Sequence, residues 1–442
     1  MRCVFLHFLM TMAALGVVRA QPALTLEAAT DRRIYLEQMH TQIYLEARVH
    51  ASAAPGPASA TVSNIAFVLD RSGSMAGEPM QALRQGLAAA INSLAERDIV
   101  SVVLFGSEVE TLLEAQRRDQ VTDLDALLAR MEPAGGSALY DALNQGAAQL
   151  RRYAGAATVN HLVLLTDGPP TKGPRELDDF TRLAGVFARE GITVSTIGLG
   201  PDFGEDLLAA LARIGNGRFR YVDRAEKIGE ALQAELAPLR TPVARDVVLT
   251  IEFNPRSEEV TSYGWEQAGV ADTTVTYRFP HLFADQDLDV LASVKLPGSN
   301  SSAKLATVRL SWKDLDGNEV HETTKALSVI YDPSPAVARS TVNREVVRVS
   351  VATLISEGMQ KAIEELDKGD FRRVMRALRR ARDEAKLMNN DLEDAPTAAK
   401  IRQLEAYLAD VEARGLNQLD RKILRSGLFN QFASPTKDSA AE

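Results

Sequence analysis

The stretch Ile65-Ala-Phe-Val-Leu-Asp70-Arg-Ser72-Gly-Ser74-Met75 joins an apolar run to an aspartate and two alternate serines. A short apolar run bounded by a polar loop is typical of a strand that is buried on both faces of a parallel sheet. The side chains that follow the strand carry oxygen atoms, which are the ligands that Mg²⁺ prefers in proteins. Taken by itself, the stretch also fits a serine and glycine turn in which Asp70 is merely solvated.

Two later stretches repeat parts of this pattern. Met131-Glu-Pro-Ala-Gly135-Gly136-Ser137 is a glycine turn whose hydroxyl stands where a new helix begins. Leu162-Val-Leu-Leu-Thr166-Asp167-Gly168 is a second apolar run that ends in an aspartate. The three stretches together favour a metal site over a simple turn.

In this order the three motifs resemble those of the von Willebrand factor A (VWA) family. Its metal-ion-dependent adhesion site consists of D-x-S-x-S, a threonine after a glycine turn, and T-D-G. Ser137 stands where the family usually has threonine, which keeps the hydroxyl but gives a side chain less stiff at χ1. The resemblance implies five metal ligands: Asp70, Ser72, Ser74, Ser137 and Asp167.

The resemblance also implies what this metal site does. It implies Mg²⁺, with Mn²⁺ or Ca²⁺ as alternatives, and an open coordination position for the carboxylate of a protein partner. Ligation rich in hydroxyls leaves the ion electrophilic enough to favour such an anion. We expect the rim of this site at residues 75–78, 135–136 and 168–170.

The composition and the first residues restrict the class of protein. A net charge of −9 argues against nucleic acid and against an anionic bilayer, because both attract a basic surface. Residues 1–20 have the pattern of a secretory signal, with a buried amino-terminal helix as the alternative. The single cysteine, Cys3, lies in this segment, so a processed chain would lack disulfides and cysteine-ligated zinc. We therefore expect an exported protein, periplasmic or secreted, without a transmembrane segment after the signal is removed.

The hydrophobic patterning divides the rest of the chain. Residues 62–240 alternate strands and helices, which predicts a doubly wound α/β domain with a mostly parallel sheet covered on both faces. Residues 21–61 and 241–332 show a period of two, which predicts an antiparallel β-sandwich. We hypothesise that residues 21–61 join this sandwich, so that the α/β domain is an insertion whose ends lie close together.

Residues 333–432 predict a C-terminal helical region, and residues 433–442 predict a flexible tail. Residues 362–371 are faintly similar to one tetratricopeptide-like hairpin, but no second copy follows at a fixed period. Six arginines between Arg372 and Arg382 fit either a nucleic-acid-binding arm or a solvated helix face. The acidic residues nearby and the expected export favour the solvated face.

The sequence favours a binding module over an enzyme. A haloacid-dehalogenase type of phosphatase needs a second aspartate two positions after Asp70, where this chain has Ser72. A serine hydrolase needs a histidine base, but the six histidines are scattered, and His161 is expected at a strand start or on the surface. The same scatter disfavours zinc.

The order of the segments resembles that of bacterial exported VWA proteins. The middle part is also similar to the inter-alpha-trypsin-inhibitor heavy chains and to the calcium-channel accessory groups. We therefore predict a metal-dependent adhesion or scaffolding module of the cell envelope that captures an acidic side chain. A chelatase-type or ATPase-coupled VWA subunit is the alternative within the family.

Overall fold

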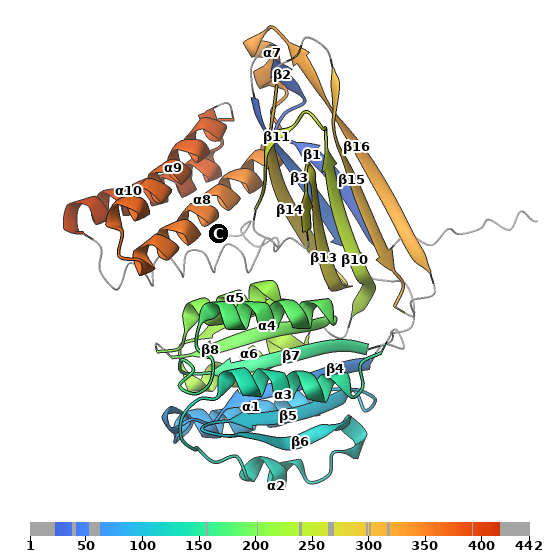
Figure 1. Cartoon of the computed structure of the whole chain (residues 1–442), viewed down its shortest axis with the longest axis vertical. Helices are drawn as coiled ribbons and strands as arrows, with labels where there is room; N and C mark the ends of the chain where they lie inside the picture. The colour runs from blue at the N-terminus through green and yellow to red at the C-terminus, as the bar shows by residue number, and fades with distance from the viewer. Residues whose placement is uncertain are drawn as a thin grey trace, which may run out of the picture.

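Figure 1 shows the computed structural model of the chain. It describes residues 23–37, 41–52, 62–155, 158–200, 202–237, 241–263, 269–297, 299, 302–315, 319–390 and 392–415. The predicted signal at residues 1–20 and the predicted tail at residues 433–442 lie outside these ranges, as do residues 416–432.

The central unit, residues 62–237, contains a six-stranded sheet with the spatial order β6-β5-β4-β7-β8-β9. Its strands are β4 (Val62–Asp70), β5 (Ile99–Phe105), β6 (Val109–Arg117), β7 (Thr158–Thr166), β8 (Ile192–Leu199) and β9 (Asn216–Val222). Only the β5–β6 pair in this sheet is antiparallel. The strand order reverses between β4 and β7, because β4 pairs with both β5 and β7.

Helices cover both faces of this sheet (Figure 1). They are α1 (Glu78–Asn92), α2 (Leu124–Ala129), α3 (Leu139–Arg151), α4 (Leu177–Arg189), α5 (Glu205–Ile214) and α6 (Ile228–Leu236). The apolar side chains of α1, α2 and α6 share one core with the sheet, and those of α3, α4 and α5 share the other. The strands β4, β5, β7 and β8 are buried along almost their whole length, because helices pack on either side of them.

A β-sandwich is built from strands on both sides of the central unit in the sequence. One sheet has the order β1-β3-β14-β11, and the other has the order β12-β13-β10-β15-β16-β2. Their bounds are β1 (Leu24–Thr30), β2 (Ile34–Leu36), β3 (Thr41–Ala51), β10 (Pro242–Phe253), β11 (Glu258–Tyr263), β12 (Gly269–Ala271), β13 (Thr274–Phe283), β14 (Gln286–Leu296), β15 (Ala303–Lys313) and β16 (Val320–Asp332).

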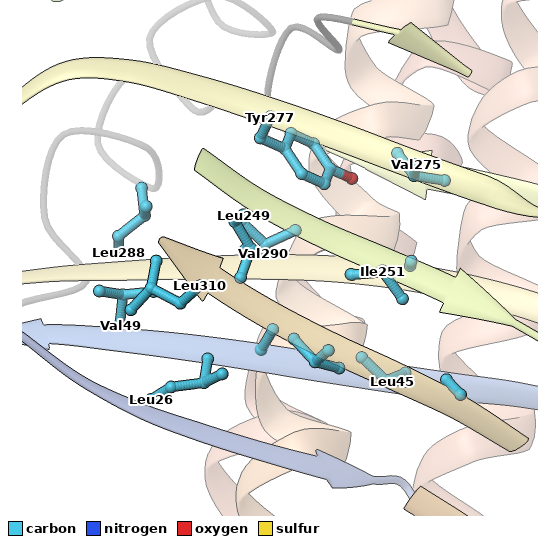
Figure 2. Close-up of a cluster of buried hydrophobic side chains, with 14 of the residues drawn as sticks. Leu26, Leu45, Val49, Leu249, Ile251, Val275, Tyr277, Leu288, Val290 and Leu310 are labelled. Carbon is cyan, nitrogen blue, oxygen red and sulfur yellow. The ribbon is translucent and has the colours of Figure 1, made fainter. Parts of the chain in front are cut away.

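Strand β3 ties the early strands to the later ones. It pairs antiparallel with β14 from Thr41↔Leu296 to Ala51↔Gln286. Alternate residues of both strands point into one apolar core, where Leu45, Val49 and Val290 face Leu249 and Leu310 of the other sheet (Figure 2). The chain therefore leaves the sandwich after β3, forms the central unit, and re-enters the sandwich at β10.

The C-terminal helical unit lies beside the sandwich (Figure 1). It contains α7 (Pro335–Ser340), α8 (Arg344–Asp367), α9 (Phe371–Asn390) and α10 (Ala395–Arg414). Gly358 in the middle of α8 lets α9 approach closely, because a Cβ at this position would lie 2.3 Å from the Cβ of Ala381. No helix in the described part of the chain is both long enough and apolar enough to cross a membrane.

Candidate metal centre

Two aspartates stand at the carboxyl ends of adjacent parallel strands. Asp70 is the last residue of β4, and Asp167 follows directly after β7. The two strands are in parallel register, with Leu69 opposite Leu165, so both carboxylates come to the same edge of the sheet. This edge is also where the strand order reverses, which is the usual ligand-binding position in a doubly wound sheet.

The carboxylate of Asp70 is fully buried and held at both oxygens. The backbone N–H of Ser72 donates a hydrogen bond to Oδ1 at 2.7 Å, and the Thr166 hydroxyl donates to Oδ2 at 2.5 Å. Burial raises the pKa of Asp70 to about 6, while the hydrogen bonds from Thr166 and Ser72 oppose that shift. The negative charge of Asp167 adds to the rise.

The two serines of the first loop meet Asp167 of the second. The hydroxyls of Ser72 and Ser74 lie 3.0 Å apart. Both donate to Oδ1 of Asp167, at 3.3 Å from Ser72 and 2.9 Å from Ser74. Three of the five expected ligands thus already form one group of oxygen atoms.

The loop that carries Ser137 is joined to the first loop through the backbone. The N–H of Gly73 donates to the carbonyl of Gly135 at 3.0 Å, and the N–H of Ala134 donates to the carbonyl of Arg71 at 2.6 Å. The hydroxyl of Ser137 is buried, and it has no hydrogen-bond partner among the described residues. It makes no direct hydrogen bond to the other four expected ligands.

The donor set fits a hard divalent cation. A buried hydroxyl without a partner costs free energy unless something fills its coordination position. Within the described ranges, neither Asp70 nor Asp167 forms an ion pair, although the two carboxylates lie close enough for one to raise the pKa of the other. A cation would balance these charges and give Ser137 its missing partner, and carboxylate and hydroxyl oxygens are ligands that suit Mg²⁺.

The sequence analysis missed two threonines that position the ligands. Thr166 holds Asp70, and its place at the strand end inside the T-D-G motif was a signal that could have been used. Thr171 accepts the N–H of Ser137 at 2.7 Å through its hydroxyl, while the carbonyl of Ser137 accepts from the backbone N–H groups of Thr171 and Lys172. No sequence pattern relates Thr171 to Ser137, because only the fold brings their loops together.

His161 was expected at a strand start or on the surface; it lies in the first half of β7, and only the surface position is excluded. It lies within β7 and is buried, with its Nε2 atom 3.1 Å from the hydroxyl of Ser195. It also stands about 17 Å from the strand end, because Thr166 follows it by five residues of extended chain. Its side chain therefore belongs to the opposite half of the strand from the two aspartates.

The fold and the oxygen cluster define an α/β domain with a site at its topological switch point. The sequence profile of the von Willebrand factor type A domain matches residues 64–234, and the chain therefore carries a domain of this family. Such domains typically bind a divalent metal ion at this site and commonly serve as protein-interaction modules.

The sequence similarity to known relatives extends beyond this domain. The uncharacterized protein YfbK of Escherichia coli is 24% identical over 287 residues, which cover 58% of this chain and 49% of YfbK. Inter-alpha-trypsin inhibitor heavy chain H2 of Mesocricetus auratus is 26% identical over 56% of this chain and 25% of its own length. The predicted similarity to these heavy chains is confirmed, and the chain spans half or less of the length of both relatives.

A solved structure shares the arrangement of most of the chain. The von Willebrand factor type A protein from Catenulispora acidiphila superimposes with a TM-score of 0.67 at 18% identity, covering 85% of this chain and 89% of that protein. At this identity the likeness shows the fold alone. It confirms the predicted fold class, an α/β domain with a mostly parallel sheet, together with the sandwich and the helical region.

Proposed function

We propose that this protein captures an acidic side chain of a protein partner through Mg²⁺ held by Asp70, Ser72, Ser74, Ser137 and Asp167. The observation that carries the proposal is the buried hydroxyl of Ser137, which has no hydrogen-bond partner in the described part of the chain, together with the carboxylates of Asp70 and Asp167, which form no ion pair there. Mn²⁺ or Ca²⁺ would suit the same oxygen donors. When bound, the ion supplies a Lewis-acidic position for one oxygen of the partner's carboxylate.

The site residues and the loop beside them have different roles in binding. Asp70 and Asp167 supply the negative charge that retains the cation. The neutral hydroxyls complete the ligand set, so the cation still attracts another anion. The loop from Gly168 to Arg175 stands at the rim, where Thr171 and Lys172 are exposed and hydrogen-bonded to the backbone of Ser137. This loop therefore supplies the surrounding contacts that give selectivity.

We propose a binding role rather than catalysis, with action in the periplasm or outside the cell. Within the described ranges, Ser72 and Ser74 have no histidine among their hydrogen-bond partners, and both bond to Asp167 instead. A nucleophilic serine needs a neighbouring base that can accept its proton. Neither relative described above is named as an enzyme.

The test compares partner retention by the full chain with Mg²⁺ and with EDTA, using wild type, Asp70→Ala and Asp125→Ala. Asp125 is an exposed residue of α2, so its replacement removes the same charge from the same domain away from the site. We expect envelope proteins to be retained by wild type and Asp125→Ala only with Mg²⁺, and not by Asp70→Ala. Equal retention by all three proteins, or retention in EDTA, would contradict the proposed function.

A further inference from the structure

Helix α9 carries a basic surface that the metal site does not use. Its twenty residues include seven basic and two acidic side chains, in a chain where 59 acidic residues outnumber 50 basic ones. One side of the helix, which includes Val374, Leu378 and Ala385, is buried in the core of the helical unit. The arginines extend from the other side, so the positive charge is concentrated on an accessible face.

This face is hollowed. A surface hollow of about 630 Å³ is lined by Arg372, Arg376, Arg379 and Arg380 together with Phe371 and Met375. Phe371 is 42% exposed, which is unusual for a large aromatic side chain, while Met375 is 4% exposed. The hollow therefore combines cationic groups with an apolar end.

The arginines of the hollow differ in their partners. Arg379 pairs with Glu412 of α10 at 2.8 Å, and Arg380 pairs with Glu384 at 2.8 Å. Arg372 and Arg376 form no ion pair with any residue in the described ranges. These two arginines stand one helical turn apart, so they present two guanidinium groups side by side.

We propose that this hollow binds an acidic polypeptide segment that carries an apolar side chain beside its carboxylates. A guanidinium group accepts a carboxylate in a bidentate pair, and the spacing of Arg372 and Arg376 suits two acidic side chains of one segment. Phe371, at the amino end of α9, gives the apolar side chain its contact. Asp383 and Glu384 line the other end of the hollow and repel carboxylates, which fixes the direction of the bound segment.

The same observations disfavour a nucleic acid. Nucleic acids are bound along a continuous basic stripe that neutralises many phosphates, whereas this surface is one hollow with two carboxylates in its lining. The chain around it is acidic overall. The hollow lies on the helical unit, so it is separate from the metal site and binds without a metal ion.

The test measures fluorescence anisotropy of a labelled glutamate-rich peptide with a central phenylalanine, added to the full chain in EDTA. A peptide with glutamine in place of glutamate is the control ligand. The variant is Arg372→Gln with Arg376→Gln, and the matched control is Lys400→Gln with Arg402→Gln. The control pair removes the same charge from exposed positions of the neighbouring helix α10, outside this hollow.

We expect the wild type and the α10 control to bind the acidic peptide, and the α9 variant to bind it about tenfold or more weakly. The glutamine peptide should bind no protein. Asp70→Ala should bind like the wild type, so this result is independent of the proposed function of the metal site.

Four outcomes would overturn the proposal. The first is that the wild type does not bind the peptide, and the second is that both double variants weaken binding equally. The third is that the protein binds phosphatidylserine vesicles more tightly than the peptide. The fourth is that the peptide binds only after residues 416–442 are removed. The third would assign the arginines to a lipid surface, and the fourth would assign the hollow to the end of this chain. Circular dichroism melting of both double variants checks that they are folded.

Discussion

At the scale of single residues, hydroxyl groups decide how the candidate metal centre is held. The Thr166 hydroxyl and the backbone N–H of Ser72 fix the two oxygens of Asp70, and the hydroxyls of Ser72 and Ser74 fix one oxygen of Asp167. These groups hold the carboxylates in place without neutralising them. These hydrogen bonds position the carboxylates, whereas the buried hydroxyl of Ser137 has no hydrogen-bond partner among the described residues.

Replacing Ser137 by alanine should lower the affinity for Mg²⁺ without lowering the stability of the metal-free protein. The substitution removes a buried hydroxyl that lacks a partner, so in EDTA the free energy of unfolding should stay the same or rise by about 1 kcal/mol. Mg²⁺ affinity should fall, because one oxygen ligand is lost. Urea unfolding in EDTA and calorimetric titration with Mg²⁺ measure the two effects. Lower stability in EDTA together with unchanged Mg²⁺ affinity would show that the hydroxyl is structural.

At the scale of elements, close helix packing on the sheet rests on particular glycines. Helices α1 and α6 cover the same face of the sheet, and Gly86 of α1 faces Gly229 of α6. A Cβ at position 86 would lie 2.8 Å from the Cα of Gly229, so any side chain there must push the helices apart. The apolar spacing of α1 was readable from the sequence, but this glycine pair was not, because its two members are far apart along the chain.

Gly86→Ala should destabilise the central unit by about 1–3 kcal/mol, because overpacking outweighs the gain in helix propensity. Gly185→Ala is the matched control in α4. A Cβ at position 185 meets its nearest atom, the Nη1 of Arg189, at 3.5 Å, which is ordinary contact. The control should be neutral or stabilised by up to about 1 kcal/mol. Thermal unfolding of both variants tests this, and equal effects would refute the packing argument.

At the scale of the whole molecule, the central unit and the sandwich each contribute a histidine that lies close enough to affect the other's charge: His161 is buried, and His281 is partly buried. Burial, together with smaller contributions from Arg218 and His281, lowers the pKa of His161 in β7 to about 3. Burial likewise lowers the pKa of His281 in β13 to about 4, with Asp246 opposing and Arg245 adding to the shift. Both histidines are therefore neutral in the folded protein well below neutral pH.

This arrangement predicts a loss of stability in acid. In the unfolded chain both histidines take up protons near pH 6.5, while the folded chain excludes them down to about pH 4 for His281 and about pH 3 for His161. The contribution of the two histidines to stability should therefore fall as the pH drops below 6.5, by about 1.4 kcal/mol per pH unit for each histidine. Burial raises the pKa of Asp70 to about 6 and that of Glu46 to about 7, so these two carboxyls contribute in the opposite direction, and the comparison with a histidine variant isolates the histidine part. Urea unfolding between pH 7 and pH 5 measures the slope. His161→Gln should change this slope by about half of the histidine contribution. A slope equal to that of the wild type would show that His161 does not contribute to it.

Much of the fold was predictable because burial leaves a local pattern. Strands covered on both faces became continuous apolar runs such as Ile65 to Leu69, and half-buried strands such as β10 alternated with a period of two. The helical unit was harder to delimit. Residues 333–432 were predicted only as one helical region, whereas the structure divides the described residues between 335 and 414 into four helices, of which α8 runs unbroken from Arg344 to Asp367.

The sequence by itself determined the kinds of elements and the identity of the candidate ligands, because strand-end aspartates and nearby hydroxyls lie within short motifs. Only the tertiary structure decided which groups meet. It paired β3 with β14, buried His161 and brought Thr171 to the backbone of Ser137, and it left the Ser137 hydroxyl without a hydrogen-bond partner among the residues that the structure describes. The physical reason is the distance along the chain over which each kind of interaction acts. Periodicity and turn chemistry act over a few residues, whereas hydrogen bonds and packing between distant segments depend on how the whole chain is folded.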